Sequence, residues 1–313
     1  MVMGVRRRLL MIPAILVAMP VTLTLALAGC GAGASSKAPG AVQSARRTGT
    51  PTKVLVVIEE NHSLAQMRAG MPFLARQSRK YGYATHWKAL THPSEPNYLA
   101  IVGGSTFGVT DDETPQVNES KVGAARSVFD QARSAGRTAG TYADSMPGHC
   151  YAYDAPARSV GRPLYAVRHN PWVYFARDRA ACRTHDVNLA GFRHAARHNA
   201  LPNVGLLIPN VLHDAHDGTL RAADTWLRKR LRPVLHSRDF KRGRLVVVVT
   251  ADEDDRHAGN TVLTSVLTPR LHHKVVTTPL THYSLTRFIA QVLHQTPLGN
   301  GRTAPDMRAA FGL

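Results

Sequence analysis

The chain has 313 residues, and its 39 Lys and Arg outnumber its 21 Asp and Glu, which gives a formal net charge of +18. This charge suits an anionic substrate, lipid surface or wall polymer, but the basic residues are scattered and form no nucleic-acid-binding motif, so we expect no nucleic-acid partner. About 260 residues follow the N-terminal segments without a second linker, which predicts a single α/β domain and a monomer.

The N-terminus has the pattern of an export signal. Three arginines at 6–8 precede an apolar run over 9–28, and the run closes in Leu27-Ala28-Gly29-Cys30. This pattern resembles a bacterial lipoprotein signal peptide, which is cleaved before a cysteine that is then lipidated. A processed signal fits better than a retained membrane helix, because small and polar residues follow the apolar run. The twin arginines leave both general and twin-arginine export open.

This interpretation divides the chain into three parts. We expect a signal peptide at 1–29, a flexible tether at 30–52 and a catalytic domain at 53–313. Lipidated Cys30 would anchor the protein to the outer face of the cell membrane. Removal of the signal takes away three arginines and no acidic residue, so the formal charge falls from +18 to +15.

The domain alternates predicted strands and helices. Continuous apolar runs predict buried parallel strands, and helical periodicity or helix-stop residues predict helices between them. The strands are expected at 54–58, 204–208 and 245–249, and the helices at 67–81, 94–102, 128–135 and 282–294. This order predicts an α/β fold with a mostly parallel central sheet and helices on both of its faces.

Polar residues follow all three predicted strands. Glu59-Glu60-Asn61-His62 follows the first, a segment from Asn210 to Asp217 the second, and Asp252-Glu253-Asp254-Asp255 the third. Each cluster alone is typical of a solvated loop. Parallel strands, however, end at one edge of a sheet, so the three clusters should meet there, and carboxylate and amide oxygens suit a hard divalent cation.

A serine lies at the start of the helix predicted at 94–102. Pro93 and Pro96 flank Ser94, which is a good N-cap residue. Free N–H groups and the positive end of the helix dipole also make this position favourable for phosphate. Ser94 is therefore either a plain helix cap or a reactive group, and the three polar strand ends favour the second interpretation.

Two cysteines remain when Cys30 is assigned to the lipid. Cys150 and Cys182 are an even pair in an exported protein, so we expect a disulfide. The alternative is two separate buried thiols.

Several strings of the domain resemble a known family. The strings are Glu60-Asn61-His62-Ser63, Thr91-His92-Pro93-Ser94-Glu95-Pro96-Asn97-Tyr98, Arg168-His169-Asn170-Pro171-Trp172, Ile208-Pro209-Asn210, His213-Asp214-Ala215-His216-Asp217 and Asp252-Glu253-Asp254-Asp255. In this order they resemble the bacterial phosphoesterase family of secreted acid phosphatases and phospholipases C, which is related to alkaline phosphatases. The similarity runs from about residue 53 to about residue 299.

The resemblance implies a role for each matching residue. Ser94 would be the nucleophile that becomes phosphorylated, with His216 as proton donor or phosphate contact and His169 beside the phosphate. Substrate contacts are expected at His92, Asn97 and Asn210. Metal ligands are expected at Glu60, Asn61, Asp252 and Glu253, and a second metal site would use Asp214, Asp217 and His282. The metal would be Ca, Mg, Mn or Zn.

Three functions remain open at this point. The first is an exported, metal-dependent acid phosphatase that hydrolyses phosphate monoesters of small molecules through a phosphoserine. The second is a phospholipase C-type phosphodiesterase that acts on phospholipid head groups, which the short chain makes less favoured. The third is a lipid-anchored binding protein that lost catalysis, which the intact Ser94, Glu60, Asn61 and Asp252 disfavour.

Overall fold

An eight-stranded sheet forms the centre of the protein in the computed structural model, which describes residues 50–157 and 161–313. Its strand order is β5-β4-β6-β1-β7-β8-β2-β9, and a separate small sheet pairs β10 with β3. Neighbouring strands are parallel except on both sides of β8, so the predicted mostly parallel sheet is confirmed. The strands are β1 (Lys53–Glu59), β2 (Gly82–Ala84), β3 (Trp87–Lys88), β4 (Ala139–Ala143), β5 (Asp186–Asn188), β6 (Val204–Ile208), β7 (Leu245–Ala251), β8 (Thr264–Leu267), β9 (Lys274–Val276) and β10 (Leu280–Thr281).

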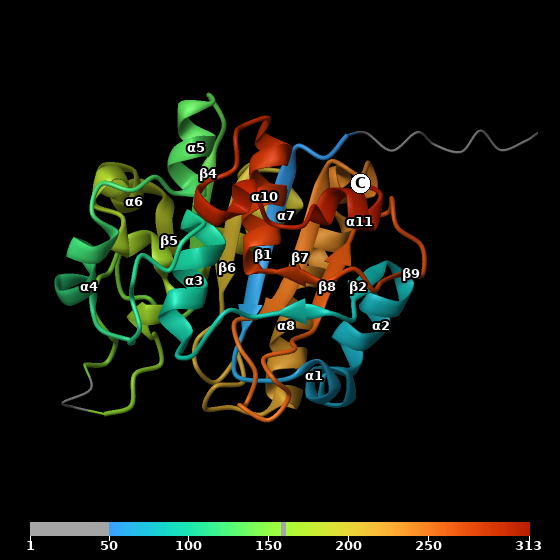
Figure 1. The fold of residues 1–313 in the computed structure, drawn as a ribbon, viewed down its shortest axis with the longest axis horizontal. Helices are drawn as coiled ribbons and strands as arrows, with labels where there is room; N and C mark the ends of the chain where they lie inside the picture. Colours follow the sequence, from blue (N-terminus) through green and yellow to red (C-terminus); the bar gives the residue numbers. More distant parts are fainter. Residues whose placement is uncertain (1–49, 158–160) are drawn as a thin grey trace, which may run out of the picture. The chain divides into compact units, whose positions relative to one another are not determined.

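The three strands predicted from apolar runs lie side by side in the middle of the sheet (Figure 1). Val56 of β1 is in register with Leu206 of β6 on one side and with Val248 of β7 on the other. All three strands are buried on both faces, which is why their sequences show continuous apolar runs instead of alternation. Their carboxyl ends therefore open at one edge of the sheet.

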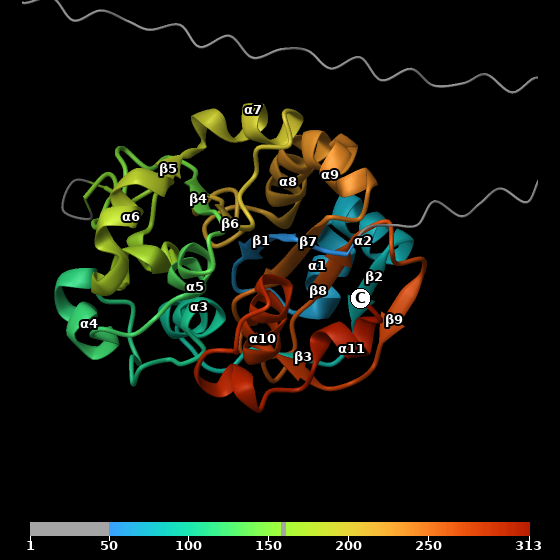
Figure 2. The same cartoon turned by 90° about the horizontal axis from the view of Figure 1, so that it is seen from above.

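Helices cover both faces of the sheet (Figure 2). One layer contains α3 (Ser94–Gly103), α5 (Val128–Ser134) and α10 (His282–Leu293), and the opposite layer contains α1 (Leu64–Gly70), α2 (Pro72–Lys80), α7 (Phe192–Arg197), α8 (Leu220–His236) and α9 (Arg238–Lys241). The remaining helices are α4 (Pro115–Val122), α6 (Arg179–His185) and α11 (Met307–Phe311), with 3₁₀ turns at Val167–His169, Pro171–Tyr174, Ala176–Asp178, Leu189–Gly191 and Gly299–Arg302. The prediction of helices on both faces is confirmed.

The helix expected at 67–81 is two helices, and that prediction was wrong. Pro72 occupies the first position of α2, where a missing N–H costs nothing, and it ends the continuous hydrogen-bond ladder from α1. The carboxylate of Asp224 on α8 accepts hydrogen bonds of 2.9 Å from the N–H groups of Phe73 and Leu74. This buried side chain thus caps α2 from a distant part of the sequence.

The two cysteines of the domain are joined in the structure. Cys150 and Cys182 form a disulfide with a Cα–Cα distance of 5.3 Å, which ties the segment after β4 to α6. The predicted signal peptide, Cys30 and the tether up to residue 49 lie outside the described residues. Among the helices that the structure describes, none combines the length and the apolar character needed to cross a bilayer.

Candidate active site

Three strand ends converge at the carboxyl edge of the sheet. Glu60 follows β1, Asp252 follows β7, and Asp214 lies in the loop after β6, and all three side chains are fully buried. The backbone ties them together, because the Glu60 N–H donates to the Asp214 carbonyl at 2.8 Å and the Asp252 N–H donates to the Glu59 carbonyl at 3.0 Å. The expected convergence of polar strand ends therefore exists in the fold.

Ser94 is the first residue of α3, and its hydroxyl does not cap the helix. Pro93 holds the N-cap position, and the Asp112 carboxylate accepts from the Glu95 N–H of the first turn at 2.9 Å, so the interpretation of Ser94 as an N-cap was wrong. The Ser94 Oγ instead donates to Glu60 Oε2 at 2.9 Å, and one turn further along Tyr98 donates to Glu60 Oε1. The hydroxyl is thus held against a buried carboxylate at the positive end of a helix.

His169 bridges two of the buried carboxylates. Its Nε2 lies 3.3 Å from Glu60 Oε1, and its Nδ1 lies 3.1 Å from Asp214 Oδ2. The Tyr98 ring stacks on the imidazole, with 5.3 Å between the ring centroids and 5° between the planes. Glu60, His169 and Asp214 each offer one ligand atom within 4.8 Å of the others, which is a geometry that could hold a metal ion.

The buried carboxylates have strongly shifted pKa values. Burial is the largest cause and raises the pKa of Glu60, Asp214 and Asp252 well above the usual range; the charge of a neighbouring carboxylate raises each further. The hydrogen bond from Ser94 lowers the pKa of Glu60, and the backbone N–H of Asn61 lowers that of Asp252. Several carboxylates that are buried away from water can be ionised together only if positive charge lies beside them.

The donor set fits a hard divalent cation. Asp252 Oδ2 is buried and has no hydrogen-bond partner within the described part of the chain, which leaves it available as a ligand. The other Asp252 oxygen accepts from the Asn61 N–H at 3.3 Å, where Asn61 turns the chain with a φ of 52°. Carboxylate oxygens from three strand ends, one imidazole and one hydroxyl match the ligands that such cations take in proteins.

Glu253 faces the loop before α3. Its Oε1 lies 2.9 Å from His92 Nδ1, and its Oε2 accepts from Asn97 Nδ2 at 3.3 Å. Burial raises its pKa to about 8. Glu253 therefore links the third strand end to the Ser94 segment.

The proposed second metal site does not assemble in the structure. Both ring nitrogens of His282 are engaged, since Nδ1 accepts from Trp87 Nε1 at 3.2 Å and Nε2 donates to the Asp252 carbonyl at 2.6 Å. Asp217 lies at the rim, 26% exposed, and accepts from His216 Nδ1 at 2.8 Å. Asp214 instead belongs with Glu60 and His169, so the grouping with His282 and Asp217 was wrong.

Arg168 is a site residue whose role the sequence did not predict. Its side chain is buried, and its charge lowers the pKa of both Glu60 and Asp214. One guanidinium nitrogen lies 3.2 Å from His216 Nε2, and Nε lies 3.5 Å from Asp112 Oδ2. Because arginine always donates, His216 accepts on Nε2 and carries its proton on Nδ1. The signal in the sequence was the position of Arg168 directly before His169.

The three residues predicted to contact the substrate make hydrogen bonds and ion pairs within the protein in this structure. Asn97 is fully buried and bonds to the backbone of Leu90, Thr91 and Pro93 as well as to Glu253. Asn210 accepts from the Leu212 and His213 N–H groups and donates to Ser145 Oγ. His92 lies between Glu253 and Asp254. These side chains position the neighbours of Ser94 and Asp214.

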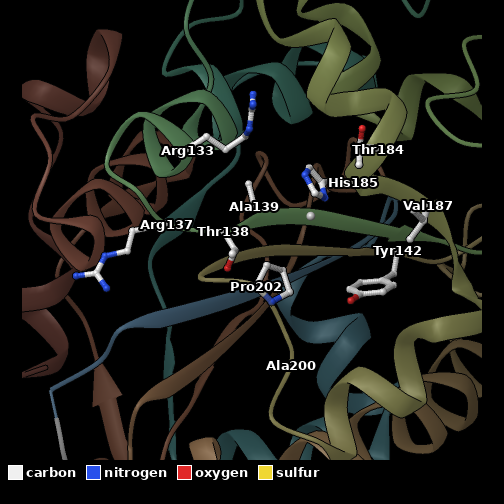
Figure 3. A pocket seen from close by; sticks show the side chains of 11 residues that line it. Arg133, Arg137, Thr138, Ala139, Tyr142, Thr184, His185, Val187, Ala200 and Pro202 are labelled. Carbon is white, nitrogen blue, oxygen red and sulfur yellow. The ribbon is translucent and has the colours of Figure 1, made fainter. Parts of the chain in front are cut away.

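A cavity of about 490 Å³ lies elsewhere, at the amino ends of β4 and β6 (Figure 3). Thr138, Ala139 and Pro202 line it, and Arg133 at its border is ion-paired with Asp178. It shares no lining residue with the cluster around Ser94, so it is separate from the active site.

Comparison with known proteins agrees with this geometry. Residues 66–294 match the Phosphoesterase family. The chain is 31% identical over 261 residues to a phosphatidylinositol-3-phosphatase of Mycobacterium tuberculosis, which covers 83% of this chain and 82% of that protein. It is 33% identical over 178 residues to a phosphate-repressible acid phosphatase of Penicillium chrysogenum, which covers 56% of this chain and 41% of that protein.

Solved structures show a similar fold. A protein of the alkaline phosphatase superfamily from Vibrio parahaemolyticus superposes with a TM-score of 0.55 and 12% identity, over 84% of this chain and 72% of that one. The lipoteichoic acid synthase LtaP of Listeria monocytogenes gives a TM-score of 0.55 at 9% identity, over 81% of this chain and 75% of that one. The fold is therefore that of the alkaline phosphatase superfamily, and the chain belongs to the Phosphoesterase family and is a phosphoric ester hydrolase.

Proposed function

We propose that this hydrolase is a metal-dependent acid phosphatase that cleaves phosphate monoesters through a phosphoserine on Ser94. The observation that carries the proposal is the buried hydrogen bond of 2.9 Å from the Ser94 hydroxyl to Glu60, at the N-terminus of α3. A serine hydroxyl is a weak nucleophile at neutral pH unless a neighbouring base or cation helps it. Glu60 is placed to accept the serine proton, and the convergent carboxylates could hold a cation.

The chemistry takes two steps. In the first, Ser94 Oγ bonds to phosphorus, its proton passes to Glu60, and the bond to the leaving alcohol breaks. The leaving oxygen takes its proton from a water molecule, because His216 Nε2 accepts from Arg168 and its Nδ1–H is held by Asp217. In the second, the hydroxide so formed bonds to phosphorus, the bond to Oγ breaks, and Ser94 Oγ takes back the proton that Glu60 holds. Arg168 would bind the phosphate oxygens throughout, because a guanidinium matches their geometry.

A divalent cation would be held near Ser94 by Glu60, His169 and Asp214, and we expect Asp252 and Asn61 to add further ligands. When bound, it neutralises phosphate oxygens and lowers the pKa of the serine hydroxyl. Two further residues hold these ligands in position. His282 fixes the Asp252 carbonyl, and Tyr98 fixes one oxygen of Glu60.

The substrate class is a phosphate monoester rather than a diester. The relative that covers most of this chain is named for removal of a phosphate from an inositol lipid, and two further relatives are named acid phosphatases. Turnover of p-nitrophenyl phosphate and of phosphatidylinositol 3-phosphate should exceed turnover of p-nitrophenylphosphorylcholine by at least tenfold, and chelation should abolish it. A preference for the choline diester would favour the phospholipase C alternative.

We further propose that the protein is exported and lipid-anchored through Cys30. The motif Leu27-Ala28-Gly29-Cys30 and the Cys150–Cys182 disulfide support this, because structural disulfides are typical of oxidising compartments. The Cys30→Ala variant should leave the membrane fraction, and Cys150 and Cys182 should resist alkylation until they are reduced. Retention of Cys30→Ala on the membrane with unchanged mass would contradict the anchor.

A further inference from the structure

Residues of α7 and α8 line a basic groove. The two helices lie in the layer opposite α3 (Figure 2). The volume of the groove is about 820 Å³, and no acidic residue lines it. Six cations line it, and they are Arg193, Arg197, Arg228, Lys229, Arg230 and Arg232. The sequence presents its basic residues as scattered, but the fold gathers these six into one groove.

The spacing of these cations aligns them in two rows. Arg228 and Arg232 are four residues apart on α8, one turn before His236, and Arg193 and Arg197 repeat that interval on α7. Residues four apart share one face of a helix, so each pair of arginines spans about 6 Å along its helix. Like charges at this spacing destabilise a helix by a few tenths of a kcal/mol per pair, so the arrangement favours an anionic occupant.

These cations lack partners of opposite charge. No carboxylate in the described residues lies within ion-pair distance of Arg193, Arg197, Arg228 or Arg232, although arginines elsewhere such as Arg179 and Arg287 are paired. The acidic residues between 218 and 244 are Asp224 and Asp239, and both are buried. Asp224 caps α2, and Asp239 pairs with Lys53 and Arg244.

We propose that this groove binds a linear chain of phosphate groups, separately from the active site. Six cations on two helices, with each arginine pair about 6 Å long, are too extended for a single phosphate and suit several phosphates in succession. The groove is concave, which favours a flexible chain over a flat lipid surface. Neither exposed Val117 nor Leu212, the kind of side chain that would insert into a bilayer, lies among its lining residues.

Binding of fluorescently labelled inorganic polyphosphate to the purified protein tests this proposal. The variant R193Q/R197Q/R228Q/R232Q should bind at least tenfold more weakly and show a smaller dependence on salt, because fewer counterions are displaced. The matched control R76Q/R79Q/R137Q/R183Q removes the same number of exposed charges outside α7 and α8 and should stay within about twofold of wild type. Equal thermal unfolding midpoints of the three proteins establish that the variants fold.

Three results would overturn the proposal. Wild-type protein that does not bind polyphosphate at low salt would exclude it, as would equal weakening in the groove and control variants. The third is groove-dependent binding to phosphatidylglycerol vesicles without binding to polyphosphate, which would assign the groove to a lipid surface. None of these readouts uses phosphatase activity, so they are independent of the proposed catalytic function.

Discussion

The Ser94 hydroxyl lies 2.9 Å from the Glu60 carboxylate, and both side chains are buried although 34 residues separate them. Burial and the nearby Asp252 charge raise the pKa of Glu60, whereas the hydrogen bonds from Tyr98 and Ser94 lower it. The hydrogen bond from Ser94 directs the serine proton at Glu60 Oε2. The Ser94–Glu60 pair therefore couples the residue that would attack phosphorus to the residue that would take its proton.

Asp252→Asn should lose metal and activity together. The substitution removes one negative charge from a buried ligand that has a free oxygen, so we expect metal content below a tenth of wild type and turnover reduced about 10³-fold or more. Metal analysis of the purified proteins checks this. Asp255→Asn, three residues further along the same loop, is the control and should keep both properties. Full metal content in Asp252→Asn would exclude Asp252 as a ligand.

Arg168→Gln should impair phosphate binding and catalysis. The guanidinium is the buried cation beside Glu60, Asp214 and His216, so its loss should reduce kcat/KM by about 10²-fold or more. Arg168→Lys should recover only part of this, because an ammonium does not make the paired hydrogen bonds. Arg162→Gln, whose side chain is 90% exposed, serves as the control. Equal kinetics of Arg168→Gln and Arg162→Gln would remove Arg168 from the site.

His282 should act as a positioning residue for Asp252. Its Nε2–H holds the Asp252 carbonyl, and burial lowers its pKa to about 4, which keeps the ring neutral. His282→Leu should weaken metal affinity by about 10- to 100-fold, whereas His282→Gln retains a donor and should lose less. Metal titration of the two variants distinguishes them. Equal losses would indicate a role in packing alone.

Much of the fold could be predicted because its central strands are unusually apolar. The runs in β1, β6 and β7 have few alternatives to a buried parallel strand. By contrast, β4 has the sequence Ala-Gly-Thr-Tyr-Ala, which only weakly indicates a strand. It is a strand because it pairs with β6 in the folded protein. Sequence periodicity also missed the break between α1 and α2.

Site residues could be predicted where they directly follow a strand. They could not be predicted where their position depends on contacts with residues far away in the sequence. Glu60 and Asp252 were found because each directly follows a strand. The inward orientation of His282 depends on Trp87, which is 195 residues away in the sequence, and no local pattern records that contact. Asp214 likewise joins Glu60 and His169 only after folding.

Asp186 should make stability depend on pH. Burial raises its pKa from 3.8 to about 6, while Thr141 and Asn170 donate to its carboxylate. The Asp186 carboxyl therefore holds its proton more tightly in the folded state than in the unfolded state. The stabilisation of the folded state by this protonation is complete below pH 3.8 and is lost as pH rises through about 6. Between these limits, the unfolding free energy of wild type should fall by up to about 3 kcal/mol relative to Asp186→Asn. Parallel pH curves from denaturant titrations would contradict this assignment.

The central claim is that Ser94 becomes phosphorylated during turnover, and an acid quench of the enzyme with p-nitrophenyl phosphate tests it most directly. Mass spectrometry should find phosphate on the peptide that contains Ser94. Ser94→Ala should show no such peptide, turnover reduced about 10³-fold or more, and metal content close to wild type. An unmodified Ser94 peptide, together with more than about a tenth of wild-type turnover in Ser94→Ala, would contradict the claim and assign the attack to water or another residue.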